Sequence, residues 1–292
     1  MPVPLIENAP AKINLTLRVL GRRDDGFHEI ESLVAFADFG DHLSFSHGGE
    51  LTLTVRGPNA VAAGAGDDNL VLKAARGLAA RRPNVVLGVF DLEKRLPVAA
   101  GLGGGSADAA AALRLIAQAN GLAADDPDLY AAARATGADV PVCLDPRPRI
   151  MRGIGEVLSG PLALPSLPAV LVNPGLALAT KSVFAGWKPA PAQTDALDTG
   201  VVGKLKDREQ LLLLLMGQSN DLEGPAIALR PVVAEALAAL RVLAGCDLAR
   251  MSGSGATCFG LFASAGAAAA AEKFLSVKQP GWWVKATMLG GA

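Results

Sequence analysis

The chain has 292 residues, of which 51% are hydrophobic and 19% are charged, and its formal net charge at pH 7 is −1. This composition is typical of a compact globular protein, and a charge so close to zero gives no electrostatic reason to expect nucleic acid or a membrane as a partner. The three cysteines are far apart in the sequence, so we expect reduced core thiols, a cytoplasmic location and no structural metal site.

Near the N-terminus, polar and apolar residues alternate from Lys12 to Val19. A period of two predicts a strand with one buried and one polar face, which puts Lys12 and Asn14 on the same side. An edge strand with its polar face in solvent would show the same pattern. After a turn and an extended segment, strands at 43–45 and 51–55 would complete an antiparallel, meander-like arrangement.

Helix signals begin with Asp67-Asp68-Asn69, a predicted cap for a helix over residues 70–80, and continue with Asp126-Pro127, which begins a helix that Gly137 ends. A strand is expected between them, at 85–92. The second half of the chain predicts, in order, a strand at 169–173, helices at 208–216 and 232–243, strands at 248–251 and 257–262, a helix at 267–275 and a strand at 282–288.

The clearest break in composition is the stretch of prolines and arginines at 145–149. We place a domain boundary there, which divides the chain into an N-terminal domain, 1–148, and a C-terminal domain, 149–292. Strands and helices alternate after the boundary, and this alternation predicts a small α+β sandwich.

A glycine-rich loop precedes one alanine-rich helix, with four glycines in the five positions from Gly101 to Gly105. Glycines let a ligand approach the backbone closely, and Ser106 is the predicted N-cap of the helix. The N-terminus of a helix offers unpaired amides and a partial positive charge. We therefore predict that the loop binds phosphate, because a tight turn alone would need only one or two glycines.

Spacing excludes three familiar types of phosphate loop. The Gly203-Lys204 pair is followed by Leu205, which a Walker A loop does not allow. A dinucleotide fingerprint that starts at Gly101 would need a sixth-position glycine, where the chain has Ser106. A protein kinase would carry His-Arg-Asp and Asp-Phe-Gly downstream of its loop, whereas here His-Arg-Asp does not occur and Asp-Phe-Gly occurs at 38–40, before the glycine loop.

Residues 97–106 instead resemble the phosphate loop of the GHMP small-molecule kinase superfamily, Pro-x-x-x-Gly-Leu-Gly-x-x-Ser. Segments along nearly the whole chain are similar to one branch of that superfamily, namely 9–15, 25–28, 68–70, 137–141, 153–156, 220–223 and 252–256. The resemblance implies a two-domain α+β fold. Its N-terminal domain would resemble domain 2 of ribosomal protein S5, and its C-terminal domain would be a ferredoxin-like sandwich.

The branch in question phosphorylates one hydroxyl of a sugar alcohol that carries cytidine diphosphate, in the non-mevalonate route to isoprenoid precursors. The resemblance implies ATP as phosphoryl donor, with Mg²⁺ accompanying the nucleotide. Another GHMP kinase, of the mevalonate, homoserine or sugar type, is the alternative within the class, and a nucleotide-binding module without catalysis is the alternative outside it. We expect a monomer or weak homodimer, with neither nucleic acid nor membrane as a partner.

The resemblance assigns catalysis to Lys12 and Asp139. Asp139 would accept the proton of the substrate hydroxyl, while Lys12 would hold the attacking oxygen and stabilise charge that develops on the transferred phosphoryl group. From the residues alone, Asp139 could equally be a helix N-cap after Gly137, and Lys12 would be a surface lysine. The implied ATP-binding residues are Pro97, Val98, Ala99, Ala100, Gly101, Leu102, Gly103, Gly104, Gly105, Ser106 and Ala107.

Substrate binding is expected from Asn14, Phe27 and His28. An aromatic ring can stack on the cytosine base and an imidazole can read its polar edge. The family usually has tyrosine at the position of Phe27, so a hydroxyl contact is lost here. Asn14 lies two residues from Lys12 and is expected to reach the same substrate.

Asp108 departs from the family, in which asparagine is common after the loop. We expect its carboxylate to favour the helix dipole, and contact with Mg²⁺ through water is the second interpretation. Arg147, Arg149 and Arg152 are expected to form a solvated boundary, with proximity to substrate phosphates as the alternative.

Overall fold

The computed structural model describes residues 3–189, 196–205 and 207–290, and contacts divide the chain into two compact units. The first unit comprises Met1–Lys12, Gly40–Val98 and Gly103–Pro146, and the second comprises Ile13–Phe39, Ala99–Leu102 and Arg147–Ala292. The predicted domains, 1–148 and 149–292, stay a prediction. The compact units differ from them, because segments 13–39 and 99–102 belong to the second unit.

The strands of the first unit are β1 (Leu5–Asn14), the second half of β3 (His28–His47), β4 (Thr52–Arg56) and β5 (Gly88–Glu93). β1 pairs with β3, β5 runs antiparallel to β3, and β4 runs parallel to β5. The predicted separate strand at 43–45 is wrong, because it is part of the long strand β3. The predicted meander is also wrong at β4, because helices connect it to β5, and such a crossover produces a parallel pair.

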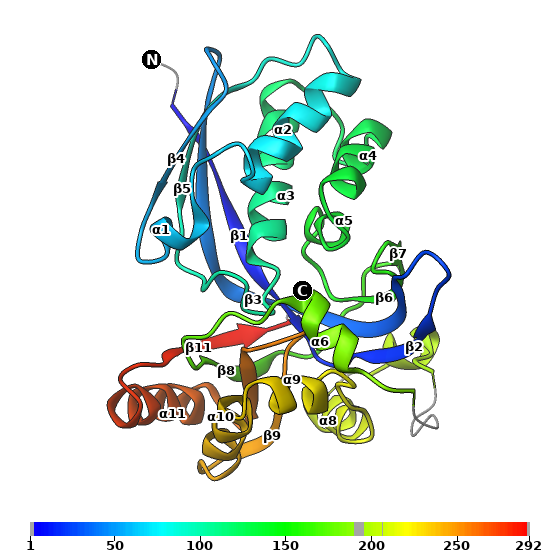
Figure 1. Cartoon of the computed structure of the whole chain (residues 1–292), viewed down its shortest axis with the longest axis vertical. Helices are drawn as coiled ribbons and strands as arrows, with labels where there is room; N and C mark the ends of the chain where they lie inside the picture. The colour runs from blue at the N-terminus through cyan, green and yellow to red at the C-terminus, as the bar shows by residue number, and fades with distance from the viewer. Residues whose placement is uncertain (1–2, 190–195, 206, 291–292) are drawn as a thin grey trace. The chain divides into compact units, whose positions relative to one another are not determined.

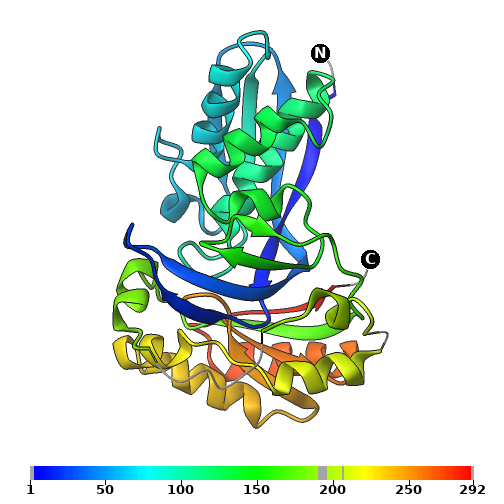
Figure 2. The ribbon, with the colours of Figure 1, turned by 90° about the vertical axis from the view of Figure 1, so that its right-hand side faces the viewer.

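The helices of the first unit are α1 (Ala60–Ala63), α2 (Leu70–Arg81), α3 (Gly104–Ala119), α4 (Pro127–Thr136) and α5 (Val140–Cys143). Figures 1 and 2 show α2, α3 and α4 side by side on one side of the strands. The predicted starts of α2 and α4 are confirmed: Asn69 accepts a hydrogen bond from the amide of Val71, and Asp126, before Pro127, accepts one from the amide of Asp128. Small buried alanines along α3 let its neighbours pack closely.

In the second unit, β2 (Arg18–Arg22) and β6 (Arg149–Gly153) pair with the first half of β3, and β7 (Val157–Leu158) pairs with β6. A second group of strands continues from β3 in the order β11 (Trp283–Leu289), β8 (Leu167–Asn173), β10 (Cys258–Phe262) and β9 (Cys246–Met251). β8 pairs antiparallel with both of its neighbours. The predicted α+β class is therefore confirmed.

The helices of the second unit are α6 (Thr180–Gly186), α7 (Thr199–Val202), α8 (Arg208–Met216), α9 (Glu223–Leu229), α10 (Val232–Arg241) and α11 (Ala265–Lys278). In Figure 1, α10 and α11 lie on the same face of the sheet formed by β11, β8, β10 and β9. Their apolar sides bury residues such as Leu237 and Leu275 in the core of this unit. In the described part of the chain, no helix combines the length and the apolar character needed to cross a membrane.

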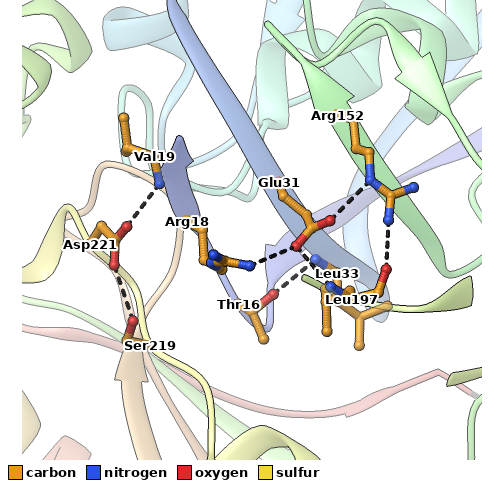
Figure 3. A network of polar contacts seen from close by, with 9 residues as sticks. All are labelled: Thr16, Arg18, Val19, Glu31, Leu33, Arg152, Leu197, Ser219 and Asp221. Carbon is orange, nitrogen blue, oxygen red and sulfur yellow. Dashed lines mark hydrogen bonds and ion pairs between the residues drawn. The ribbon is translucent and has the colours of Figure 1, made fainter. Parts of the chain in front are cut away.

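A buried carboxylate joins three parts of the second unit (Figure 3). Glu31 on β3 accepts hydrogen bonds from Arg18 at 3.3 Å, Arg152 at 2.9 Å and the amide of Leu197 at 2.9 Å. Arg152 also donates to the carbonyl of Leu197 at 2.6 Å. Arg149 donates to the carbonyl of Ser159, so both arginines are bonded to protein groups.

Candidate active site

Lys12 and Asp139 are brought together in the first unit. Lys12 lies on β1 with 4% of its side chain exposed, and its Nζ is 3.3 Å from Oδ2 of Asp139, which is 39% exposed. Asp139 occupies the N-cap position of α5, yet its side chain makes no capping hydrogen bond. A carboxylate that solvent reaches therefore faces a buried ammonium group, and the interpretation of Asp139 as a helix cap fits its position but not its contacts.

The polar residues that alternate along β1 are buried, so the interpretation as a solvent-facing edge strand is wrong. Lys12, Asn14 and Thr16 are 4%, 2% and 1% exposed. The strand also ends at Asn14, and β2 begins only at Arg18. Buried polar groups need hydrogen-bond or charge partners. Lys12 pairs with Asp139, and Oγ1 of Thr16 accepts a hydrogen bond from the amide of Leu33.

Lys12 also lies against the glycine loop. A Cβ built on Gly103 would be 3.1 Å from Cε and 3.2 Å from Cβ of Lys12, and Gly103 has a left-handed backbone with φ of 61°. This position therefore requires a residue without a side chain. The lysine, the carboxylate and the residue that caps α3 are thus neighbours within one unit.

Helix α3 begins two residues before the predicted N-cap. Gly103 is the N-cap, so Gly104, Gly105 and Ser106 form the first turn, and the prediction of Ser106 as the cap is wrong. A left-handed glycine can begin the helix without a capping side chain, which is why the helix starts earlier. The amides of a first helical turn have no partner within the helix, and the partial positive charge of α3 is at this end.

The middle of the glycine loop is held by a second glycine-rich segment, 252–256, in the second unit. The carbonyl of Ala100 accepts a hydrogen bond from the amide of Thr257 at 3.1 Å, and that of Gly101 accepts one from Oγ of Ser252 at 2.9 Å. A Cβ on Gly101 would be only 2.4 Å from the carbonyl oxygen of Ser252. Glycine is therefore required here for a close backbone approach, in addition to any approach by a ligand.

Asn14 lies in a buried polar cluster of the second unit. Its amide donates to Oγ of Ser252 at 3.1 Å, and its Nδ2 donates to Oγ of Ser32 at 2.7 Å. These bonds fix the orientation of the side chain next to the segment that holds the glycine loop. Contact of Asn14 with a substrate stays a prediction.

His28 lies in an aromatic cluster that the sequence analysis missed. Its ring is 4.9 Å from the ring of Phe184 and 5.8 Å, edge-on, from that of Trp187. Phe27 is 57% exposed. Since only 4% of this chain is aromatic, the close spacing of Phe184 and Trp187 in the sequence was a signal that could have been used.

Burial and, to a lesser extent, the positive charge of Arg22 lower the pKa of His28 from its ordinary value of 6.5. The imidazole is therefore neutral at pH 7. A neutral imidazole offers one donor and one acceptor, as recognition of the edge of a base requires.

Asp108 has a different environment from either predicted one. It lies beyond the first turn of α3 and is buried, with Oδ2 2.5 Å from Nζ of Lys94, which is also 2.6 Å from Oδ2 of Asp41. The interpretation of Asp108 as a helix-dipole residue is therefore wrong. Bonding to an ammonium group also makes it unsuitable as a cation ligand, and among the described residues no group of three metal-ligating side chains occurs.

Burial and neighbouring charges shift the pKa values of Asp108 and Lys94. Burial raises the pKa of Asp108 to about 7 against the opposing charge of Lys94, and the charge of Asp41 adds to the increase. Burial alone would lower the pKa of Lys94, but the charges and hydrogen bonds of Asp108 and Asp41 raise it overall. The carboxyl of Asp108 therefore has a pKa near neutral pH, because its burial disfavours the charged form.

Comparisons with known proteins agree with these features. Family models described as the GHMP kinases N terminal domain and GHMP kinases C terminal match residues 69–145 and 203–279. A 4-diphosphocytidyl-2-C-methyl-D-erythritol kinase of Methylorubrum extorquens is 57% identical over 287 residues, which cover 98% of this chain and 99% of that protein. The protein of the same name from Xanthobacter autotrophicus is 57% identical over 285 residues, which cover 96% of this chain and 97% of that protein.

Solved structures show the same likeness. The crystal structure of a 4-(cytidine 5'-diphospho)-2C-methyl-D-erythritol kinase is 36% identical, with a TM-score of 0.78, and the match covers 99% of this chain and all of the other. A homoserine kinase from Cytophaga hutchinsonii is 19% identical, with a TM-score of 0.73 over 99% of this chain and 95% of the other, and so shares the fold. The predicted GHMP kinase fold is thus confirmed, and the chain belongs to the 4-diphosphocytidyl-2-C-methyl-D-erythritol kinase family of GHMP kinases.

Proposed function

We propose that this protein transfers the terminal phosphoryl group of ATP to the 2-hydroxyl of 4-diphosphocytidyl-2-C-methyl-D-erythritol, in the synthesis of isoprenoid precursors. The observation that carries the proposal is the Lys12–Asp139 pair, at 3.3 Å, beside Gly103 at the start of α3. Relatives more than half identical over nearly the whole chain carry the name of this kinase.

In the proposed reaction, Asp139 accepts the proton of the substrate hydroxyl. The oxygen then forms a bond to the γ-phosphorus of ATP, and the bond from that phosphorus to the bridging oxygen of ADP breaks. The ammonium of Lys12 orients the attacking oxygen and offsets negative charge in the transition state. Phosphoryl transfer depends mainly on such positioning and charge stabilisation, and the exposure of Asp139 leaves it accessible to a hydroxyl group.

The triphosphate would bind at the N-terminal amides of α3, from Gly104 to Ser106. Mg²⁺ would neutralise charge on the phosphate oxygens, and it is usually bound by one or two carboxylates together with those oxygens. The remaining loop residues, from Pro97 to Leu102, would contact the nucleotide through their backbone.

The cytosine base would bind at His28, whose neutral imidazole can donate one hydrogen bond and accept another. The neighbouring rings of Phe184 and Trp187 offer an aromatic surface on which a base can stack. Phe27, which is exposed, would cover the base from the solvent side.

The test is turnover by the purified full-length protein. Incubation with ATP, Mg²⁺ and 4-diphosphocytidyl-2-C-methyl-D-erythritol should release ADP, measured by a coupled assay, and the product should carry phosphate on the 2-hydroxyl by ³¹P NMR. Mevalonate, homoserine and galactose are the control acceptors. Turnover of one of these at an equal or higher kcat/KM would contradict the proposed substrate.

A further inference from the structure

A buried ionic cluster that the proposed reaction does not use lies in the first unit. Lys94, Asp41 and Asp108 are 3%, 0% and 5% exposed at their side chains, and the ammonium of Lys94 is 2.6 Å and 2.5 Å from the two carboxylates. Moving charged groups out of water costs free energy, and only close, well-aligned ion pairs and hydrogen bonds can offset that cost.

The cluster connects the two ends of the glycine loop. Lys94 lies three residues before Pro97, where the loop begins, and Asp108 lies in α3, into which the loop leads. Their ion pair therefore links the chain that enters the loop to the helix that leaves it.

The entering segment is also fixed to the sheet. Oδ1 of Asp41, on β3, accepts hydrogen bonds from the amide of Arg95 at 2.6 Å and the amide of Leu96 at 2.8 Å. The same carboxylate thus holds the backbone before the loop and, through Oδ2, the ammonium of Lys94. Both carboxylate oxygens act on the position of one short segment.

The ammonium group lies close to the first residue of α3. A Cβ built on Gly104 would be 3.2 Å from Nζ of Lys94 and 3.5 Å from Cδ1 of Leu96. Gly104 carries one of the amides proposed to bind the triphosphate. A change in the position of the ammonium would therefore move the start of the helix directly.

We propose that Lys94 is a positioning residue for the nucleotide: by bridging Asp41 and Asp108 at 2.6 Å and 2.5 Å, it sets the distance between the two ends of the glycine loop. The loop amides then keep the spacing that a triphosphate requires. This inference rests on the proposed function, because it assumes that the loop binds ATP. It assigns no contact between Lys94 and the substrate that carries cytidine.

The experiment compares Lys94→Met and Asp108→Asn with the parent enzyme. Methionine keeps the length of the side chain without charge, and asparagine keeps an acceptor for Lys94 without charge. Lys73→Met is the matched control, since Lys73 is an exposed lysine on α2 in the same unit. The KM values for ATP and for the cytidine-bearing substrate, the Kd of ATP by calorimetry and the midpoint of thermal unfolding are measured for each variant.

We expect Lys94→Met to raise the KM and Kd for ATP by about tenfold or more, because displacements of about 1 Å can cost up to about 100-fold. Asp108→Asn should raise both by about threefold, because it weakens the bridge without removing it. The KM for the cytidine-bearing substrate should change less than about twofold in both variants, and Lys73→Met should match the parent.

A purely structural cluster would lower the midpoint of unfolding and leave the KM and Kd for ATP at the parent values, and that result overturns the inference. If Lys94→Met does not fold, Asp108→Asn decides, and parent-like ATP binding in that variant overturns the inference as well. If the parent binds ATP but phosphorylates another acceptor, the proposed substrate fails while the Kd comparison still tests Lys94. A parent that binds no ATP overturns both.

Discussion

Asp139 is the residue whose geometry bears most directly on function. Its carboxylate is 39% exposed, although its partner Lys12 is 4% exposed. A buried ammonium needs a nearby opposite charge, whereas a carboxylate that only stabilised the fold could be buried as well. The partial exposure of Asp139 leaves one side of the pair open to a hydroxyl group.

Replacement of Asp139 by asparagine should therefore separate catalysis from binding. Removal of a general base costs about 10²–10⁴-fold in rate, so we expect a fall in kcat of that size with little change in the Kd of ATP. Asp125→Asn, at an exposed position of the same unit, is the control. Turnover close to the parent rate in Asp139→Asn would exclude Asp139 as the base, and absence of turnover in the parent would favour a binding module.

At the scale of elements, the glycine loop is a connection whose conformation is set by the segments around it. Gly103 caps α3 in a left-handed conformation, and Gly101 packs against the backbone of the 252–256 segment. Glycine adopts left-handed and right-handed conformations about equally readily, so the contacts around the loop must select one of them. Two features therefore require glycine in this loop. Its backbone has positive φ angles that other residues rarely adopt, and the 252–256 segment lies too close for a side chain at Gly101.

Gly101→Ala should be far more damaging than an alanine at an open left-handed position. The new Cβ would be 2.4 Å from the carbonyl oxygen of Ser252, in addition to the backbone strain at φ of 75°. Gly121→Ala is the matched control, because Gly121 has φ of 66° and nothing within 4 Å of the added Cβ.

We expect Gly121→Ala to lower the free energy of unfolding by about 1 kcal/mol and Gly101→Ala by about 3 kcal/mol or more. Only Gly101→Ala should also raise the Kd of ATP. Urea unfolding and calorimetry measure the two effects. Equal losses of stability in both variants would show that the contact with Ser252 is relieved at little cost.

At the scale of the whole molecule, the buried cluster links stability to pH. The pKa of Asp108 is raised to about 7 from an ordinary value of 3.8. The folded protein therefore binds more protons than the unfolded chain between these values, so its free energy of unfolding falls as pH rises through them. Lys94 and Asp41 are the charged groups that face Asp108. Because the pKa of Lys94 is raised, its own titration lies at far higher pH.

Asp108→Asn should remove this dependence. The parent should lose stability relative to the variant as pH rises from the ordinary pKa of 3.8 to the raised value of about 7. Urea unfolding at intervals of half a pH unit gives the comparison. Parallel profiles for the parent and Asp108→Asn would show that Asp108 is ionised throughout this range.

Local patterns predicted many of the elements correctly. The starts of α2 at Asn69 and of α4 at Asp126-Pro127 were evident because caps and first-turn prolines depend on residues within one turn. The short helices α1, α6, α7 and α9 were missed, since four to seven residues are too few to show a helical period. The start of α3 was placed too late, because the left-handed Gly103 begins the helix without a capping side chain and so leaves no capping signal in the sequence.

The kinase family, the glycine loop and the candidate catalytic residues Lys12 and Asp139 could be predicted from the sequence, because short motifs consist of consecutive residues. Which distant side chains meet could be seen only in the folded chain. Folding buried the polar face of β1, placed Phe184 and Trp187 beside His28, and bridged the two ends of the loop through Lys94. Such contacts follow from how helices and strands pack, and packing joins residues whose separation along the chain carries no periodic signal.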